Sequence, residues 1–320
     1  MRQILFGKGN PASHPHYTHK VAYRGLIPMD KALEAVGDKN ARNQHMHIGP
    51  GRHILHFPVA NQTLINVAAF VSDPHDWKDD EKMTAPATRE EVEEAFAEWG
   101  PTVRAMTSLL PDTLDRWAIF DSFDHPAPTY SRGRICIAGD AAHASAPHHG
   151  AGAGIGVEDA LCLSSLLEMA MSSLQLNKAT KDQALCTAFD TFNDVRHERS
   201  QWLVNSSRGI CDTYEWADPK IGNDPEKCFK EIEWRSHKIW HFDIEGMLGD
   251  AAAAYERRLK AKEGRLGDLK AIAITDGILG NAAEEYEWRL KANGGKQDDL
   301  KAVPATVSER ALNQLEAATT

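Results

Sequence analysis

A glycine-rich segment between residues 131 and 171 constrains the fold more than any other part of the sequence. It opens with residues 134–138, a short apolar run with β-branched side chains that predicts a strand between Gly133 and Gly139. Asp140 then lies at the expected carboxyl end of this strand. Open α/β sheets place ligand-binding groups at such ends, so the segment indicates a binding site at Asp140.

A cluster of glycines follows the strand and leads into a predicted helix over residues 157–171. The helix has apolar residues at helical spacing, and Glu158 and Asp159 lie in its first turn, where acidic side chains favour a helix start. Glycines before a helix N-terminus let backbone N–H groups come close to an anion or a polar carbonyl. The cluster consists of Gly150, Gly152, Gly154 and Gly156. A glycine loop alone can also be a simple tight connection. The identification of this segment therefore rests on the order of the residues around the glycines.

The segment contains GDAAH, then a proline, then GAGAG and EDA. This order resembles the second FAD-binding motif of the single-component aromatic-ring hydroxylases, the flavoprotein monooxygenases that include salicylate hydroxylase. The resemblance implies that Asp140 hydrogen-bonds the ribityl chain of FAD and that Pro147 lies beside the flavin ring and the substrate. It implies that the positive end of the helix beginning near Val157 favours the anionic reduced flavin. The residues that would face the N1/O2 edge of the flavin are Gly150, Ala151, Gly152, Ala153 and Gly154.

Two other kinds of site fit the segment less well. The spacing of His143, His148 and His149 matches neither a helical histidine pair nor a zinc finger, so we predict no metal site. The hydrolase pattern G-x-S-x-G is absent, because Ser145 lacks glycines at that spacing. We interpret His143 as a packed residue that supports the site rather than as a catalyst.

Composition excludes several classes of partner. With a net charge of −10 and no basic block, the chain is predicted to bind no nucleic acid. No apolar run approaches the roughly 20 residues that a membrane span needs, and the first residues are too short an apolar segment for a signal peptide. Five cysteines, an odd number without paired spacing, favour free thiols in a reducing compartment. We therefore expect a cytoplasmic protein.

The nucleotide-binding unit that opens members of the resembled family is not found in this sequence. Both a βαβ unit with G-x-G-x-x-G, which holds the ADP half of FAD, and a later Asp-Gly motif are missing. Residues 1–7 resemble the segment that follows the Asp-Gly motif, so the chain resembles the later part of such an enzyme, roughly its last two-thirds. Two explanations stay open: a truncated gene record, or a natural protein that has lost its nucleotide-binding half.

Residues 20–125 are predicted to form an antiparallel substrate-binding domain. One face of such a sheet can cover the flavin and enclose an aromatic substrate. A helical run is expected at residues 29–36. The expected strands, separated by turn residues, are 20–28, 45–48, 53–59 and 63–72.

Two stretches of this domain, YRGLIP and QHMHIGP, resemble fungal salicylate-hydroxylase-like enzymes. Arg24 in the first could bind a substrate carboxylate or phenolate through two parallel hydrogen bonds. His47 in the second could take the phenol proton if its pKa lies near neutrality. Strand periodicity predicts that His45, His47 and His53 share one face, with His56 joining them only across a break in the alternation. The alternative for each of these residues is that it is an ordinary strand residue with no role in binding or catalysis.

The segment after the sheet predicts a return to the flavin-binding domain. Residues 89–110 predict an amphipathic helix with Thr88 as its N-cap, broken at Pro101. Residues 114–121 are predicted to form a strand that leads back to the flavin-binding domain.

Later segments are predicted to be helical. Residues 182–218 have helical periodicity. We interpret Arg196 and Arg199 in this helix as part of a salt-bridged scaffold rather than as a functional pair. Residues 245–271 and 276–302 are alike, which suggests a local duplication of a helix and turn rather than a solenoid.

Together these features predict a mixed α/β and α+β fold: an incomplete Rossmann-like FAD-binding domain, an antiparallel substrate domain and C-terminal helices. The resemblance implies an FAD-dependent monooxygenase that uses NAD(P)H and dioxygen to hydroxylate a phenolic or aromatic acid, and a homodimer is compatible with it. The alternative, motivated by the missing ADP-binding unit, is a catalytically inactive remnant that acts as an accessory or interaction protein. The expected domains are 1–19 and 126–218 for FAD, 20–125 for substrate, and 219–320 as a helical extension.

Overall fold

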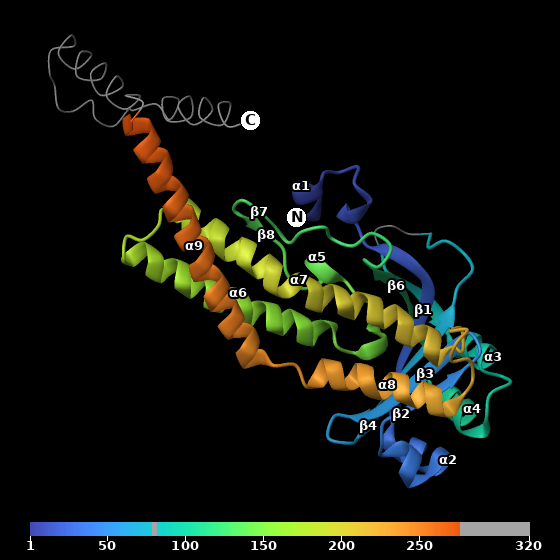
Figure 1. The fold of residues 1–320 in the computed structure, drawn as a ribbon. Helices are drawn as coiled ribbons and strands as arrows, with labels where there is room; N and C mark the ends of the chain where they lie inside the picture. The colour runs from blue at the N-terminus through green and yellow to red at the C-terminus, as the bar shows by residue number, and fades with distance from the viewer. Residues whose placement is uncertain (79–81, 276–320) are drawn as a thin grey trace, which may run out of the picture. The chain divides into compact units, whose positions relative to one another are not determined.

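The structure, a computed structural model, describes residues 1–78 and 82–275, with side chains through residue 261 (Figure 1). The chain divides into a compact unit, Met1–Leu259, and a second unit, Lys260–Thr320. The sheet, the helices packed on it and the candidate site all belong to the first unit. The second copy of the repeat, residues 276–302, lies outside the described residues.

A six-stranded antiparallel sheet forms one layer of the first unit, with its strands in the order β2-β3-β4-β1-β6-β5. The antiparallel meander predicted for this region is confirmed by the pairing of β2 with β3 and of β3 with β4. β5 is not among the strands predicted from the sequence; it contains Pro86 and is an edge strand, where proline is tolerated. The strands are β1 (His16–Pro28), β2 (His45–Gly49), β3 (Arg52–Val59), β4 (Leu64–Ser72), β5 (Thr84–Thr88) and β6 (Thr113–Asp121).

Helices make up most of the rest of the first unit. None of the helices in the described range is both long enough and apolar enough to cross a membrane. The α-helices are α1 (Arg2–Phe6), α2 (Met29–Ala41), α3 (Arg89–Ala95), α4 (Pro101–Ser108), α5 (Asp140–His143), α6 (Gly152–Gln175), α7 (Lys181–Tyr214), α8 (Pro225–Trp240) and α9 (Ile244–Thr275). Two 3-10 turns are η1 (Pro11–Ser13) and η2 (Pro147–His149).

One face of the sheet packs on α2, α3 and α4. The predicted break of residues 89–110 at Pro101 is confirmed, because α3 ends before it and α4 begins there. Thr88 is the N-cap of α3, as predicted, and it forms a capping box with Glu91. The sheet residues buried on this face include Val21, Tyr23, Ile27, Ile54, Ile65, Val67 and Ala69.

The other face of the sheet is less covered, and we call it the open face. A small buried cluster of Ala22, Ala68, Phe70 and Ile119 packs there against Ala146, next to η2. Along the same strands, large side chains stay exposed: Leu26 is 49% and Trp117 41% accessible. The open face therefore presents exposed apolar side chains on the strands that contact the predicted flavin loop.

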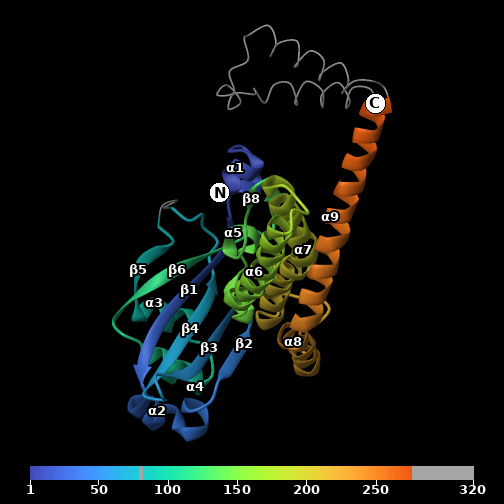
Figure 2. The same ribbon diagram turned by 90° about the vertical axis from the view of Figure 1, so that its left-hand side faces the viewer.

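The helical layer contains α6 and α7, which run side by side next to the sheet (Figure 2). The strand predicted over residues 134–138 is much shorter than expected. It is reduced to β8 (Ile135–Cys136), which pairs only with β7 (Ser131–Arg132) in an antiparallel ribbon. Among the described residues, no parallel sheet forms at this point, so the Rossmann-like part is represented by its loop and helices.

The alanine variant of Gly25 tests how tightly the covered face is packed. Gly25 lies in β1, and an added Cβ would lie 2.6 Å from Cδ2 of Leu110 and 3.2 Å from Cδ of Pro111. Leu110 is only 2% accessible and cannot move aside easily. We expect Gly25→Ala to lower the free energy of unfolding by about 1–3 kcal/mol in urea titrations followed by circular dichroism.

The matched control is Gly9→Ala, whose Cβ would meet no atom within 4 Å. We expect it to change stability by less than about 0.5 kcal/mol. Equal effects of the two variants would contradict the packing described for this face.

Candidate active site

Asp140 begins α5 directly after a sharp turn at Gly139. The φ of Gly139 is 56°, a conformation that glycine adopts with little strain. The carboxylate of Asp140 is exposed and has no hydrogen-bonding partner among the described residues. It is therefore available to a ligand, as a ribityl-binding role requires.

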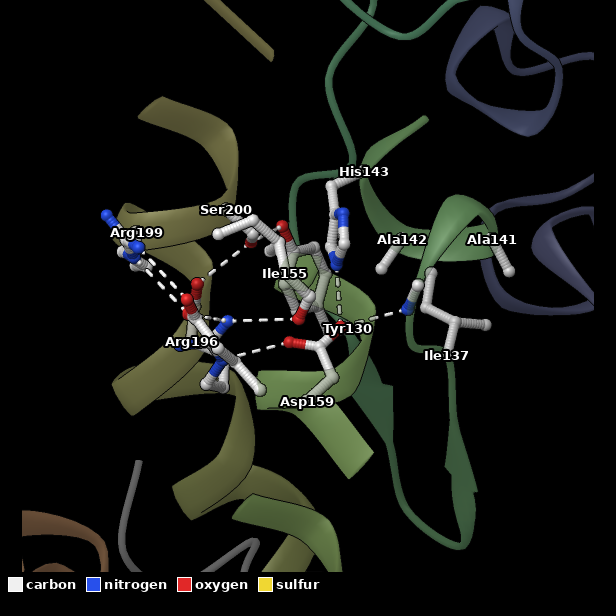
Figure 3. Close-up of polar contacts among 12 residues, drawn as sticks. Tyr130, Ile137, Ala141, Ala142, His143, Ile155, Asp159, Arg196, Arg199 and Ser200 are labelled. Atoms are coloured by element: carbon white, nitrogen blue, oxygen red, sulfur yellow. Dashed lines mark hydrogen bonds and ion pairs between the residues drawn. The ribbon is translucent and has the colours of Figure 1, made fainter. Parts of the chain in front are cut away.

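A buried carboxylate holds this turn in place from the side of α6 (Figure 3). Oδ2 of Asp159 accepts a hydrogen bond from the backbone N–H of Gly139 at 2.9 Å and lies 2.6 Å from Nε2 of His143. Oδ1 of Asp159 accepts a hydrogen bond from Nε of Arg196 in α7 at 2.9 Å. The three side chains are all buried. One carboxylate thus joins the turn before Asp140 to α5, α6 and α7.

The charge of Asp159 is stabilised by these partners. Burial alone would raise its pKa, but the hydrogen bond and charge of His143, the Gly139 N–H and Arg196 together hold the pKa below its ordinary value. His143 is consequently a packed partner of Asp159, as predicted from its place in the sequence.

Glu158 extends the network toward α8. Its carboxylate pairs with the guanidinium groups of Arg196 at 2.8 Å and Arg199 at 2.9 Å. Arg199 also donates to the backbone carbonyl of Lys238 at 2.8 Å, and its guanidinium carbon lies 4.0 Å from the ring centroid of Phe242. The salt-bridged scaffold predicted for the two arginines is confirmed. Glu158 and Asp159 lie in the second turn of α6, because the helix begins at Gly152 rather than near Val157.

The N-terminus of α6 presents uncapped backbone N–H groups. Its N-cap is Ala151, which offers no capping side chain, and the first helical hydrogen bond runs from the N–H of Ile155 to the carbonyl of Ala151. The N–H groups of residues 152–154 therefore have no partner within the helix. Together with the helix dipole they favour a polar or anionic group at this end.

The glycines around this N-terminus leave room for such a group. Gly150 has a φ of 64°, and a Cβ added at Gly154 would meet no atom within 4 Å. The packing of the chain itself therefore does not require glycine at position 154, whereas close approach of an external group would. Gly150 and Gly154 border a cavity of about 280 Å³ whose far wall includes Trp240 and Phe242.

Arg24 lies on the open face of the sheet, as a substrate-binding role requires. It is exposed, and its guanidinium carbon lies 5.7 Å from the ring centroid of Trp117 on the neighbouring strand. In the strand pairing it lies opposite Ala68, a member of the small cluster that contacts Ala146. Pro147 is the next residue, so Arg24 shares its face of the sheet with the predicted flavin loop.

His47 lies on the other face, with His45 and His56. The ring centroids of His47 and His56 are 5.2 Å apart, and Nε2 of His56 bonds the carbonyl of Asn40 in α2. Burial, with contributions from His56 and His45, lowers the pKa of His47 to about 4. The structure does not bring Arg24 and His47 together, and the acid–base role of His47 stays a prediction.

The predicted grouping of His53 with His45 and His47 is wrong. In the β2–β3 pairing His56 lies opposite His45, whereas His53 lies opposite Ile48 and so points to the open face. The hairpin turn at residues 50–51 shifts the alternation by one residue. His56 joins His45 and His47 across this shift, so its expected dependence on a break in the alternation is confirmed.

His53 instead belongs to a buried polar cluster that sequence reasoning missed. Nε2 of His53 lies 3.3 Å from Nδ1 of His148, and Nδ1 of His53 lies 3.1 Å from Oε1 of Glu215. Glu215 also accepts a hydrogen bond from Nζ of Lys20. The members come from β1, β3, η2 and the end of α7, so no local spacing could have revealed them. The position of His148 directly after Pro147 was the one available signal.

The buried carboxylate is tested by Asp159→Asn. Because the pKa of Asp159 is held below its ordinary value, its stabilising contribution is complete above pH 4 and is lost as the pH falls through the folded-state pKa. Removing one partner of a buried ion pair typically costs about 3–5 kcal/mol. We expect Asp159→Asn to lower the free energy of unfolding by that amount in urea titrations at pH 7. At pH 3 the difference in free energy of unfolding between the variant and the wild type should be smaller.

Asp140→Asn is the matched control, because its carboxylate is exposed and unpaired among the described residues. We expect its effect on stability to stay below about 0.5 kcal/mol. A gap between Asp159→Asn and the wild type that did not depend on pH would contradict the charged state assigned to Asp159.

Comparison with known proteins places this geometry in a family. The sequence matches the FAD binding domain family over residues 35–207. FAD-dependent monooxygenase eupB of Phoma sp is 56% identical over 259 residues, which cover 78% of this chain and 58% of that protein. Salicylate hydroxylase asL1 of Sarocladium schorii is 51% identical over 267 residues, covering 81% of this chain and 56% of that protein. The chain therefore spans less than two-thirds of the length of these relatives.

Solved structures agree with the fold. A salicylate hydroxylase substrate complex matches with a TM-score of 0.67 and 32% identity, over 74% of this chain and 57% of that one. CtdE in complex with FAD and substrate 4 matches with a TM-score of 0.64 at 16% identity, over 82% of this chain and 61% of that one, which shows the fold alone. The flavoprotein hydroxylase fold predicted from the sequence is confirmed. Because the family match covers more than half of its residues, this chain belongs to the FAD binding domain family, and it is similar to relatives named FAD-dependent monooxygenase and salicylate hydroxylase.

Proposed function

We propose that the whole protein uses FAD, NAD(P)H and dioxygen to hydroxylate a phenolic or aromatic acid. The observation that carries the proposal is the juxtaposition of an uncapped, glycine-lined helix N-terminus with an open sheet face that bears Arg24. The names of the relatives, FAD-dependent monooxygenase and salicylate hydroxylase, support it. The homodimer and the cytoplasmic location expected from the sequence stay predictions.

The flavin half of FAD fits the residues predicted to hold it. Asp140 offers a free carboxylate for the hydroxyl groups of the ribityl chain, and Pro147 offers an exposed apolar ring edge. The backbone N–H groups of residues 152–154 offer donors to the polar edge of the ring, within a loop that runs from Gly150 to Gly154. Bound FAD would supply the redox chemistry and the activation of dioxygen, which no side chain can provide.

The substrate would lie between this loop and the open face of the sheet. An aromatic ring can pack on the exposed Trp117, while Arg24 binds its carboxylate or phenolate by two parallel hydrogen bonds. This arrangement supports the proposed division of the chain, with substrate-binding residues in 20–125 and flavin-binding residues in 126–218. Residues 1–19 would complete the flavin-binding part, and 219–320 would form the helical extension.

Flavin binding by the 320-residue chain is the first test of this proposal. The residues assigned here face the isoalloxazine and ribityl parts, so riboflavin is a suitable probe beside FAD. We expect both to bind, measured by quenching of flavin fluorescence, and we expect Asp140→Ala to raise the Kd for each by about tenfold or more, as the loss of a charged hydrogen bond does.

Gly154→Ala separates binding from stability. Alanine is the better helix former, so the variant should be as stable as the wild type or up to about 1 kcal/mol more stable. Its methyl group would occupy the space kept for the flavin, and the Kd for riboflavin should rise about tenfold or more. Unchanged riboflavin affinity in this variant would remove the glycine loop from the proposed site.

Arg24→Gln tests the substrate side. We expect it to weaken salicylate binding to the FAD-saturated chain by about 10- to 100-fold, because a charged hydrogen bond is lost. Isothermal titration with salicylate measures the change. Arg132→Gln, an exposed arginine in β7, is the matched control and should leave the affinity unchanged. Equal affinities in the two variants would exclude Arg24 from the binding site.

A further inference from the structure

A chain of polar side chains runs from the wall of the proposed site to the protein surface. Its inner links are the contact between the rings of His148 and His53 at 3.3 Å and that between His53 and Glu215 at 3.1 Å. Nζ of Lys20 then donates to Oε2 of Glu215 and to Oγ of Ser72, the latter at 3.2 Å. Ser72 is exposed, so the chain ends at water.

The three inner members of this chain are more buried than Lys20. The side chain of Lys20 is 16% accessible, whereas Glu215, His148 and His53 are 5% accessible or less. The inner members are therefore screened from solvent, and they exchange protons with water most directly through Lys20.

The inner end lies on the open face of the sheet, next to Pro147. His148 directly follows Pro147, and its ring centroid lies 5.1 Å from that of Phe70 in an edge-on contact. The ring of His53 stacks on the same Phe70 at 4.5 Å. Nδ1 of His148 faces His53, while its Nε2 has no hydrogen bond with another described residue. That nitrogen is free to accept a proton.

We infer that this chain, His148–His53–Glu215–Lys20, carries the phenolic proton of the substrate to the protein surface. The inference rests on the proposed function, because it requires a phenol on the open face. It differs from the sequence-based hypothesis, in which His47 takes the proton, since His47 lies on the opposite face of the sheet.

Each link of this chain passes on one proton. The phenolic O–H gives its proton to Nε2 of His148, and the proton on Nδ1 of His148 moves to Nε2 of His53. The proton on Nδ1 of His53 moves to Glu215, and the Glu215–Lys20 pair releases one proton to water. The products are a phenolate and one aqueous proton, and each imidazole has exchanged its protonated nitrogen.

The surroundings of the two rings suit transfer rather than storage of a proton. Burial lowers the pKa of His148 far below the ordinary histidine value, and His53, Lys20, His149 and Arg208 act in the same direction. Burial also lowers the pKa of His53, although Glu215 opposes it. Both rings are therefore neutral at pH 7, with one donor and one acceptor nitrogen each.

A metal ion is the competing use of the same groups. His53, His148 and Cys211 place one potential ligand atom each within 4.8 Å of one another. In the structure, however, the two facing ring nitrogens contact each other, and burial raises the pKa of the Cys211 thiol, which disfavours a ligating thiolate. A bound metal would occupy these nitrogens and stop the transfer.

The test follows the ionisation of 4-nitrophenol, whose phenolate absorbs visible light, on the FAD-saturated 320-residue chain by stopped flow. The wild type should ionise the bound probe at a pH below the pKa of the free phenol. His53→Ala should slow phenolate formation about 100-fold, in line with the contribution of a positioned acid–base group. Added imidazole should restore the rate in proportion to its concentration, because it can fill the space that the ring leaves.

Further variants cover the outer end and the other face. Lys20→Met keeps the aliphatic stem and should also slow the release, so the inference can be tested even if His53→Ala does not fold. His45→Gln, a histidine on the covered face, should leave the rate unchanged. Buffer-dependent titration calorimetry should show one proton released for each 4-nitrophenol bound.

Several outcomes would overturn the inference. Probe binding without ionisation would overturn the transfer chain alone, whereas no binding at all would overturn the proposed function and the chain with it. Slow ionisation in His53→Ala that imidazole does not restore would show a structural role. Stoichiometric zinc in the purified protein, or a rate that depends on His47 and not on His53, would assign these residues differently.

Discussion

The buried carboxylate of Asp159 is the interaction on which the candidate site depends. An ionised carboxylate without partners in the protein interior would cost several kcal/mol, so it persists only because three groups hydrogen-bond it. Those groups come from the turn at Gly139, from α5 and from α7. The charge therefore sets where the turn lies relative to the helices, and with it the position of the free carboxylate of Asp140.

The glycines of the site divide into two physical kinds. Gly156 packs against the turn at Gly139, where an added Cβ would lie 3.7 Å from the Gly139 Cα, an ordinary van der Waals distance. Gly154 has empty space where a side chain would be, although it lies in a helix that alanine would stabilise. Keeping glycine there costs stability without any packing benefit inside the chain, which is the pattern expected where a ligand approaches the backbone.

The sheet separates two sets of polar side chains that are close in sequence. On the covered face, His45, His47 and His56 lie among α2 and the apolar core, and burial keeps His47 uncharged at neutral pH. On the open face, His53 reaches His148 and Glu215. Because successive strand residues alternate between faces, a difference of one residue decides which histidines can meet a substrate.

The sequence by itself determined the family, the antiparallel meander, the break at Pro101 and the glycine-rich stretch that leads into a helix, because each depends on local spacing or on a contiguous motif. It also identified Arg196 and Arg199 as scaffold, since charged residues on a long helix usually pair. Only the tertiary structure decided the start of α6 at Gly152, the shortening of the strand before Asp140, and the face on which each histidine lies. It alone revealed the contact between His53 and Glu215, which are 162 residues apart. Such contacts depend on how strands and helices pack, and local residue spacing carries no record of that packing.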